Sequence, residues 1–395
     1  MNRKQRRAEQ AAAKAGQPSG ENDPIDLHSA GIEAFRTGRL DLAARLIAQA
    51  IAADGNKPDF HYNLAIVLKA QGRLAEAAAC YQRAIALRPG YADAHNNLGN
   101  IWKTLGERNK ALASFAAALE HRPGNADTLY NLGLLSSETG DREMAALYFR
   151  RCLEHDPDDS RGARMLLARL GLAGAPEQAS EAQLQRIYDV RSRFWDSEQS
   201  YFAPALVAEA FSQHARGALD ILDIGCGTGL VGALVRPFMN AAAGRLDGID
   251  ISRAMLDKAE AKGVYDRLDK GDLVSFLSAH KDSYDTILAA ATLIHFGDLQ
   301  TLFQAAAQSL RAKGLFIFTV FSHEQDSDFS VAASDPLAQS GCYSHSMGYV
   351  ERLAAESGFS ARLLTKVVHE HGRDGNPVPG LLAVLRRDEP GRDMP

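Results

Sequence analysis

The chain has few cysteines and no long apolar run, and each absence excludes a class of protein. Its four cysteines, Cys80, Cys152, Cys226 and Cys342, are far apart and form no CxxC or Cys/His pattern, so neither a disulfide framework nor a metal site is expected. No stretch of roughly eighteen or more apolar residues is present, and the N-terminus lacks the apolar core of a signal peptide. We therefore expect a cytoplasmic protein without a membrane span.

The chain also lacks a strong excess of charge of one sign. A formal net charge of -5 over 395 residues gives no broad attraction to phosphate backbones, so no nucleic-acid partner is expected. Residues 1–24 are basic and polar, and we predict them to be a disordered tail, as we do for residues 389–395. The hydrophobic content of 46% supports about two packed domains.

A period of 34 residues runs through the first half of the sequence. The positions in register are Gly38, Gly72, Gly106 and Gly140, then Ala43, Ala77, Ala111 and Ala145, then Tyr81, Phe115 and Phe149, and then Pro89, Pro123 and Pro157. The pattern predicts helix-turn-helix hairpins. Glycine forms the turn, alanine allows close helix contact, the aromatic residues fill the space between successive hairpins, and proline ends the second helix.

This pattern resembles the tetratricopeptide repeat, most closely in the unit that contains His95, Leu98, Gly99 and Trp102. Four units and a following helix, over residues 25–172, are expected to stack into an α-solenoid. The resemblance implies a protein or peptide partner on the concave face of that solenoid. His61 and His95, also 34 residues apart, are interpreted as surface residues of the repeats rather than metal ligands.

Three asparagines, Asn63, Asn97 and Asn131, recur with the same period. In repeats of the type found in O-linked N-acetylglucosamine transferases, the matching asparagines grip peptide backbone, and the resemblance implies the same here. A side-chain amide offers both a donor and an acceptor, which suits any peptide regardless of its sequence. Alternatively, these asparagines belong to the repeat consensus and contact a neighbouring helix.

The 34-residue register ends at residues 173–184, whose composition we interpret as a linker. Beyond it, apolar strands alternate with helical stretches over residues 185–388, which predicts a doubly wound α/β sheet. The strongest motif is DIGCGTG at residues 223–229, a buried strand that runs into a glycine-rich turn and then a helix. Asp250 and Asp272 end the next two predicted strands, and the carboxyl ends of parallel strands meet at the edge where ligands bind.

These residues resemble the class I S-adenosylmethionine-dependent methyltransferases. The resemblance implies S-adenosylmethionine as the cofactor, with the glycines against its methionine and ribose part, Asp250 at the ribose hydroxyls and Asp272 at the adenine amino group. It implies that Asp223 supports the loop, or the cofactor's amino group through water. The cofactor-binding residues that it implies are Asp223, Gly225, Cys226, Gly227, Gly229, Asp250, Ile251, Met255, Asp272, Leu273 and Ala289.

A nicotinamide cofactor is the alternative, because Gly227, Gly229 and Gly232 also satisfy GxGxxG. Asp272 favours the methyltransferase interpretation, since the dinucleotide fingerprint has no counterpart for it. Residues 361–370 and 378–387 predict a closing hairpin, and such a hairpin inserts its last strand antiparallel in methyltransferase sheets but not in dehydrogenase sheets. We therefore predict a seven-stranded Rossmann-like sheet with an antiparallel last strand.

More narrowly, the chain resembles a group of bacterial predicted methyltransferases with N-terminal tetratricopeptide repeats. The strings LIHFGDLQTLF, CYSHSMGYVERLAAESGF and GNPVPGLLAVLRR resemble that group, as does a lid segment from Tyr188 to Asp196, which folds over the cofactor in relatives. Arg191 stands where an aromatic residue is usual, and Ala291 where an aspartate often follows the fourth strand. These departures leave the class of methyl acceptor open.

Methyl transfer from a sulfonium needs alignment and exclusion of water more than a catalytic side chain. A nitrogen or oxygen acceptor can still need a base, for which His295 is the candidate; alternatively it only shapes the pocket. The lid and acceptor-side candidates are Tyr188, Trp195, Tyr343 and His345. We favour an enzyme that methylates a protein recruited by the repeats. The alternatives are a small-molecule methyltransferase whose repeats serve assembly, and an inactive scaffold.

Overall fold

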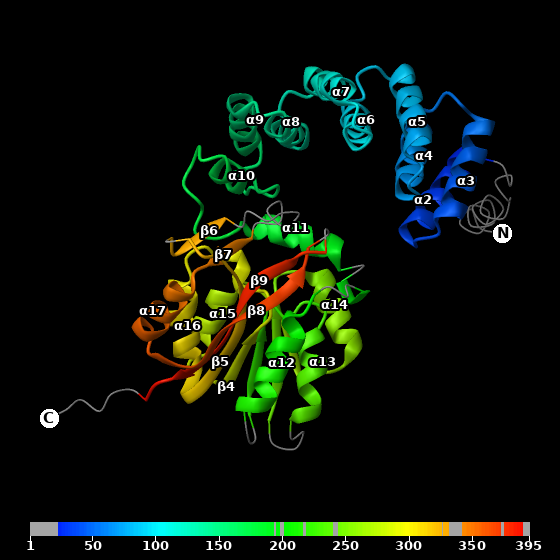
Figure 1. Ribbon diagram of the computed structural model, residues 1–395. Coiled ribbons are helices and arrows are strands. Elements are labelled where there is room, and N and C mark those ends of the chain that lie inside the picture. The colour runs from blue at the N-terminus through cyan, green and yellow to red at the C-terminus, as the bar shows by residue number, and fades with distance from the viewer. Residues whose placement is uncertain are drawn as a thin grey trace, which may run out of the picture. The chain divides into compact units, whose positions relative to one another are not determined.

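The computed structural model describes residues 23–192, 195–197, 201–215, 219–239, 244–325, 327–331, 342–372 and 375–389. Their contacts divide the chain after His155 into two units, which are taken one at a time below (Figure 1). The two predicted disordered tails lie outside the described residues, apart from Asp23, Pro24 and Glu389. The helix that follows the repeats, α10 (Ala163–Arg169), belongs to the second unit by its contacts, whereas the sequence pattern attached it to the repeats.

The first unit consists of four helical hairpins. Their helices are α2 (Pro24–Arg36), α3 (Leu40–Ala53), α4 (Pro58–Ala70), α5 (Leu74–Leu87), α6 (Ala92–Thr104), α7 (Arg108–His121), α8 (Ala126–Glu138) and α9 (Arg142–His155). Each hairpin turns at one of the four periodic glycines, whose φ angles run from 75° to 81°, a left-handed conformation that glycine adopts without strain. The second helices end shortly before Pro89, Pro123 and Pro157, as predicted.

The periodic residues interlock both within and between hairpins. A Cβ atom on Gly99 would lie 2.6 Å from the ring of Phe115, and one on Gly133 would lie 2.5 Å from the ring of Phe149. The missing side chains therefore make room for the fully buried rings. Phe115 also packs in one cluster with Leu132 of the next hairpin. The aromatic positions thus bind the two helices of a hairpin together as well as joining neighbouring hairpins.

The second unit is built on a mixed sheet. Its strands are β1 (Ile221–Ile224), β2 (Leu246–Asp250), β3 (Arg267–Lys270), β4 (Tyr284–Ala289), β5 (Leu310–Ser322), β6 (Phe329–Val331), β7 (Tyr343–His345), β8 (Phe359–His371) and β9 (Pro377–Arg387). Seven of them follow the order β3-β2-β1-β4-β5-β9-β8, in which β1 to β5 are parallel and β9 is antiparallel to β5. This confirms the predicted sheet. The short strands β7 and β6, which the sequence did not predict, extend it beside the end of β5.

Helices cover both faces of this sheet (Figure 1). On one face, α12 (Ala203–His214) and α13 (Leu230–Val235) form a core with the strands, and α14 (Arg253–Lys262) lies on β2 and β3. On the other face, α15 (Leu273–Ala279), α16 (Gln300–Ser309) and α17 (Met347–Glu356) form a second core. Among the described residues, no helix combines the length and apolar character needed to cross a bilayer.

The stretch that precedes the sheet is more ordered than the linker that its composition predicted. Helix α11 (Glu181–Arg191) begins inside residues 173–184, and the Ser180 side chain accepts a hydrogen bond from the amide of Gln183 at its start. This is the N-terminal half of a capping box. A 3-10 turn, η1 (Trp195–Ser197), follows α11. The predicted linker is therefore wrong for its last residues, which lead into the functional site.

Candidate functional site

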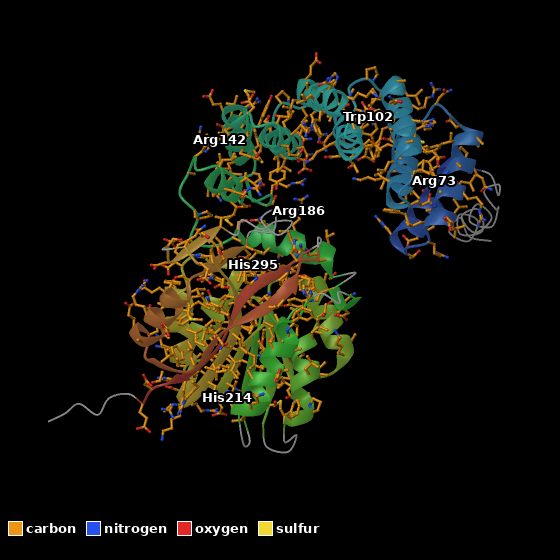
Figure 2. The ribbon with its side chains drawn as sticks, in the orientation of Figure 1. Arg73, Trp102, Arg142, Arg186, His214 and His295 are labelled. Carbon is orange, nitrogen blue, oxygen red and sulfur yellow. The ribbon has the colours of Figure 1, made fainter. Side chains whose placement is uncertain are left out.

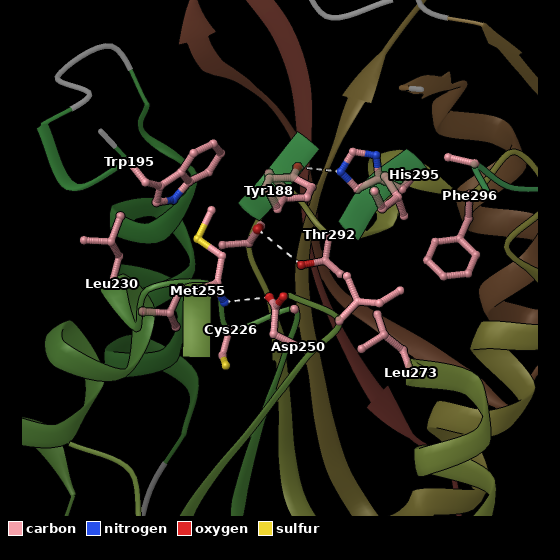
Figure 3. Close-up of a pocket in the computed structure, with 18 of the residues that line it drawn as sticks. Tyr188, Trp195, Cys226, Leu230, Asp250, Met255, Leu273, Thr292, His295 and Phe296 are labelled. Atoms are coloured by element: carbon pink, nitrogen blue, oxygen red, sulfur yellow. Dashed lines mark hydrogen bonds between the residues drawn. The ribbon is translucent and has the colours of Figure 1, made fainter. Parts of the chain in front are cut away.

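A cavity of about 990 Å³, including space open to solvent, lies at the carboxyl ends of the parallel strands (Figures 2 and 3). Its walls come from the loop after β1, the end of β2, the start of α15, the segment after β4, and α11 with η1. The residues predicted to bind here that do line it are Gly225, Cys226, Gly227, Asp250, Ile251, Met255, Asp272, Leu273, Tyr188, Trp195 and His295.

The glycine-rich loop is held by the carboxylate of Asp250. Its Oδ2 accepts a hydrogen bond of 2.8 Å from the amide of Gly227, and its Oδ1 accepts one of 2.8 Å from the amide of Ser252. Gly227 has a φ of 55°, and a Cβ atom there would meet nothing within 4 Å, so its backbone lies against open space in the cavity wall. A Cβ on Gly225 would lie 2.3 Å from Thr292. Gly227 thus exposes its backbone to the cavity, and Gly225 allows the loop to pack against Thr292.

Asp223 lies beneath this loop and not in the cavity wall. Its side chain is almost fully buried, and its Oδ2 accepts a hydrogen bond of 2.7 Å from the Tyr265 hydroxyl. Its Oδ1 is buried and has no hydrogen-bond partner among the described residues. Burial raises the pKa of this carboxyl to about 7; the bond from Tyr265 opposes the rise, and the neighbouring Asp250 carboxylate adds to it. Asp223 therefore holds Tyr265, whose ring packs against Gly229 at the end of the loop.

Two further predicted cofactor residues also lie outside the cavity wall. Gly229 has a φ of 85° and packs its backbone against Tyr265, 3.0 Å from where a Cβ atom would be. Ala289, at the end of β4, is fully buried in the core that faces α16. Both residues shape the layer behind the cavity, because the Gly229 backbone packs on Tyr265 and the Ala289 side chain lies in the core.

The cavity is also lined by apolar side chains and by two carboxylates from the region of β2 and α15. The apolar residues are Ile251, Met255 and Leu273, and the carboxylates are Asp250 and Asp272. The Asp272 Oδ1 accepts a 2.8 Å hydrogen bond from the amide of Ser275, which caps α15. Its side chain is exposed, so its second oxygen can accept a hydrogen bond from a ligand amino group.

The lid segment, in its described residues, is fastened to the loops that carry the cavity. The Ser252 hydroxyl donates a 2.6 Å hydrogen bond to Asp189, and the Gln185 amide donates to the carbonyl of Ile251 at 3.3 Å. Farther along, the Asp196 carboxylate accepts hydrogen bonds from the Thr228 hydroxyl and, at 2.8 Å, from the Lys262 ammonium. Asp189 and Asp196 of the lid segment thus hold it against the loop after β2 and the glycine-rich loop after β1.

The remaining wall is aromatic. The Tyr188 hydroxyl and the Nε2 atom of His295 are 2.6 Å apart and hydrogen-bonded, which joins α11 to the segment after β4 (Figure 3). Trp195 packs edge-on against Tyr188, with 5.6 Å between ring centroids, and against Tyr201, with 5.3 Å. Phe296 completes this wall. Burial raises the pKa of Tyr188, so its phenol stays protonated.

Tyr343 and His345 were predicted to line the acceptor side, and the structure places them elsewhere. Both lie on β7 and are fully buried. The Tyr343 hydroxyl donates a 2.5 Å hydrogen bond to the carbonyl of Pro176, and the His345 Nε2 lies 3.0 Å from the carbonyls of Phe296 and Gly297. Burial lowers the pKa of His345 to about 4, so it is neutral. Both side chains fasten the backbone behind the cavity.

Several residues of the cavity wall were missed from the sequence. They are Gln178, Ala179, Glu181, Leu184, Tyr201, Pro204, Leu230, Val231, Gly271, Ala290, Ala291, Thr292 and Phe296. The serine and glutamine at the start of α11 were a usable helix-start signal, and they would have brought Glu181 and Leu184 into the same helix as Tyr188. Nothing in the local pattern singles out Tyr201, because its position just before α12 depends on how that helix packs against β5 and β9.

The three periodic asparagines that were predicted to bind peptide lie in the first unit, among the repeats. The side-chain amide nitrogens of Asn63, Asn97 and Asn131 approach one residue each of the preceding repeat. These contacts are to His28 Nε2 at 2.8 Å, the Tyr62 hydroxyl at 3.1 Å and Asn96 Oδ1 at 3.1 Å. The asparagines therefore join neighbouring repeats, as the alternative interpretation expected. His61 and His95 contact the carbonyls of Gly55 and Pro89.

Comparison with known proteins agrees with both units. Residues 221–314 match the family model described as a methyltransferase domain, and residues 67–106 and 104–170 match models described as TPR repeat and tetratricopeptide repeat. A probable S-adenosylmethionine-dependent methyltransferase, CRG1 of Saccharomyces cerevisiae, is 31% identical over 36% of this chain and 49% of its own length.

Two further likenesses are found. A malonyl-[acyl-carrier protein] O-methyltransferase of Acetivibrio thermocellus is 30% identical over 28% of this chain and 38% of its own length. Among solved structures, the 1,6-didemethyltoxoflavin-N1-methyltransferase of Burkholderia thailandensis aligns with 53% of this chain and 87% of its own, at 16% identity and a TM-score of 0.43.

The chain thus carries a class I S-adenosylmethionine-dependent methyltransferase domain, preceded by tetratricopeptide repeats. S-adenosylmethionine is the cofactor of that class. The chain spans about half the length, or less, of the curated relatives that it matches.

Proposed function

We propose that the second unit binds S-adenosylmethionine in this cavity and methylates an acceptor that enters beside Tyr188 and His295. The observation that carries the proposal is the Asp250 carboxylate, which lines the cavity and holds the amide of Gly227 beside open space. Gly225 and Gly227 would hold the methionine and ribose part, Asp250 the ribose hydroxyls, and Asp272 the adenine amino group. The cofactor supplies a methyl group on a positively charged sulfur. That sulfur leaves readily, because it becomes neutral when the carbon–sulfur bond breaks.

The residues of this chain contribute alignment and exclusion of water. The hydrogen bonds of Asp189 and Asp196 hold the lid segment against the loops that carry the cavity. His295 lines the cavity, and its Nε2 can receive a proton through the Tyr188 hydroxyl. This supports His295 as the group that takes up the acceptor's proton, which it then returns to solvent.

Titration calorimetry of the full chain with S-adenosylmethionine and S-adenosylhomocysteine tests the cofactor site. We expect Gly227→Ala to abolish the binding heat, because its Cβ would fill the space that the cofactor needs. Gly263→Ala is the matched control: Gly263 has a φ of 63° and equally open surroundings, but it lies outside the cavity. No heat with the folded wild-type chain would refute the proposal.

We further propose that the repeats bind a protein partner and recruit it as the methyl acceptor. The amide oxygens left by the asparagine contacts support this role, since a peptide backbone offers N–H donors for them. Among the described residues, the four cysteines form no disulfide, which supports a reducing compartment such as the bacterial cytoplasm.

The fate of the methyl group separates this proposal from its alternatives. Cell lysate is incubated with the wild-type chain and radiolabelled S-adenosylmethionine, with Gly227→Ala as the blank. Label in a protein band supports recruitment of a protein acceptor, whereas label confined to the small-molecule fraction supports a small-molecule enzyme whose repeats serve assembly. No label in either fraction, with cofactor binding intact, would support a binding scaffold.

A further inference from the structure

The acceptor side of the cavity has walls of aromatic rings. Tyr188, Trp195 and Tyr201 follow one another in edge-on contact, and all three line the cavity. The Tyr201 hydroxyl donates a 3.2 Å hydrogen bond to the carbonyl of Ala290, which fixes that ring. In Figure 3, Tyr188, Trp195 and His295 lie at one end of the cavity, away from Asp250 and Cys226. The electron-rich faces of such rings attract a cation.

The charged groups of the cavity wall all have one sign. Among the described residues that line it, the carboxylates are Glu181, Asp250 and Asp272, and there is no lysine or arginine. Arg191 is near enough to Tyr188 to influence it electrostatically, but it does not line the cavity, and Asp250 and Glu370 act on Tyr188 in the opposite sense. An anionic acceptor would find no counter-ion in this wall, whereas a cation would find the rings and the carboxylate of Glu181, since Asp250 and Asp272 are assigned to the cofactor.

We propose that the methyl acceptor is an amine, which binds as its ammonium between Tyr188, Trp195 and Tyr201 and is methylated on nitrogen. The inference rests on the proposed function, and it names the chemical class of the acceptor. Glu181 lies in the first turn of α11, three residues before Leu184 in the same wall, and it supplies a carboxylate for the incoming cation. A carboxylate or phosphate acceptor is disfavoured by the same residues.

The transfer balances without another reactant. The ammonium first gives one proton to the Tyr188 oxygen while the Tyr188 hydroxyl proton passes to Nε2 of His295. The freed lone pair on nitrogen forms a bond to the methyl carbon as the carbon–sulfur bond breaks, and that electron pair stays on sulfur. Nitrogen takes the positive charge that sulfur loses, and His295 releases its proton to solvent. A tertiary amine bound as its ammonium gives up its single proton by the same route and becomes a quaternary ammonium ion.

Three probes of the same shape and different charge test the inference by binding alone. Choline is the cation, 3,3-dimethylbutan-1-ol is its neutral isostere, and 3,3-dimethylbutanoate is the anion. Each is titrated by ligand-observed NMR into the full chain saturated with S-adenosylhomocysteine, whose sulfur is neutral. We expect choline to bind about tenfold more tightly than the neutral probe, as cation–π contacts in a sheltered site allow, and the anion to bind most weakly.

Variants show whether the rings cause the preference. Trp195→Leu should remove most of it, and Trp195→Phe should retain part of it, while both still give binding heat with S-adenosylhomocysteine. Trp102→Phe, in the repeat unit, is the matched control and should leave the preference unchanged. If Trp195→Leu also fails to bind S-adenosylhomocysteine, the test uses Trp195→Phe instead. A smaller ratio of choline affinity to neutral-probe affinity in Trp195→Phe than in wild type would then support the role of the ring, and an unchanged ratio would count against it.

The outcomes separate this inference from the proposed function. Equal binding of the three probes, or tightest binding of the anion, with S-adenosylhomocysteine bound, would overturn the amine acceptor and leave the cofactor site standing. Choline binding that S-adenosylhomocysteine abolishes would also overturn it, because the rings would then belong to the cofactor's own site. Failure of S-adenosylhomocysteine to bind would overturn the proposed function, and the amine acceptor with it.

Discussion

The buried carboxyl of Asp223 should make the stability of the second unit depend on pH in an unusual direction. Burial raises its pKa from 3.8 to about 7, so the folded state favours the protonated acid. The contribution of Asp223 to the free energy of unfolding is fully present below the pKa that this carboxyl has in the unfolded chain. It is lost as pH rises through about 7, the pKa in the folded state. We therefore expect the free energy of unfolding of the second unit to fall between about pH 4 and pH 7 because of this one group.

The size of the effect follows from the pKa change. A rise from 3.8 to about 7 corresponds to ~4 kcal/mol, as an order of magnitude. Asp223→Asn keeps an oxygen to accept the Tyr265 hydrogen bond but cannot ionise. The variant loses some stability at low pH through its buried amide N–H groups, by ~1–3 kcal/mol. Its stability relative to wild type should then improve steadily as pH rises to 8.

Urea unfolding from pH 4 to pH 8 measures this difference. Trp102→Phe serves as the background, so that Trp195 reports on the second unit alone. Asp266→Asn is the control, since its hydrogen bond with Arg236 is the largest cause of a lowered pKa, which puts its pH dependence below about 4. Parallel curves for wild type and Asp223→Asn would refute the reasoning, because they would mean that Asp223 is ionised in the folded state at little cost.

Three further predictions follow from single contacts. Gly225→Ala should destabilise the second unit by more than ~2 kcal/mol in urea unfolding, because its Cβ would overlap Thr292 and its φ of 64° is left-handed; unchanged stability would contradict this close packing. Asp196→Asn should speed release of S-adenosylhomocysteine about two- to fivefold in stopped flow, since its ion pair is partly exposed; an unchanged rate would show that this contact does not hold the lid. Asn97→Ala should cost the repeat unit ~1 kcal/mol through its lost bond to Tyr62, measured by Trp102 fluorescence in urea; equal stability would mean that this bond contributes nothing.

The repeats and the parallel sheet were predictable because each depends on a pattern that repeats along the chain. A turn glycine or a small alanine has the same task in every hairpin, so four copies reveal it. The glycine-rich loop was equally visible, since only glycine permits the left-handed conformation beside a ligand. The contact between Gly227 and Asp250 follows from the topology, because parallel strands bring both to one edge.

The orientation of side chains within that edge was not predictable. Asp223 belongs to the motif, but alternation along β1 turns it with Ile221 toward the face covered by α12 and α13, where it contacts Tyr265 instead of the cavity. Tyr343 and His345 stand on a strand of three residues, too short for any periodic pattern. Its pairing with β5 and β6 faces both side chains inward, and only the tertiary structure decides that.

The cofactor loop and the acceptor wall are connected through one continuous set of hydrogen bonds. Asp250 accepts from the amides of Gly227 and Ser252, and the Ser252 hydroxyl donates to Asp189 on α11, next to Tyr188. Tyr188 in turn contacts His295 after β4. Asp189 and Tyr188 are neighbours on α11, so these contacts link the glycine-rich loop to the aromatic wall through that helix. The site that would bind the methyl donor therefore also sets the geometry of the wall that would receive the acceptor.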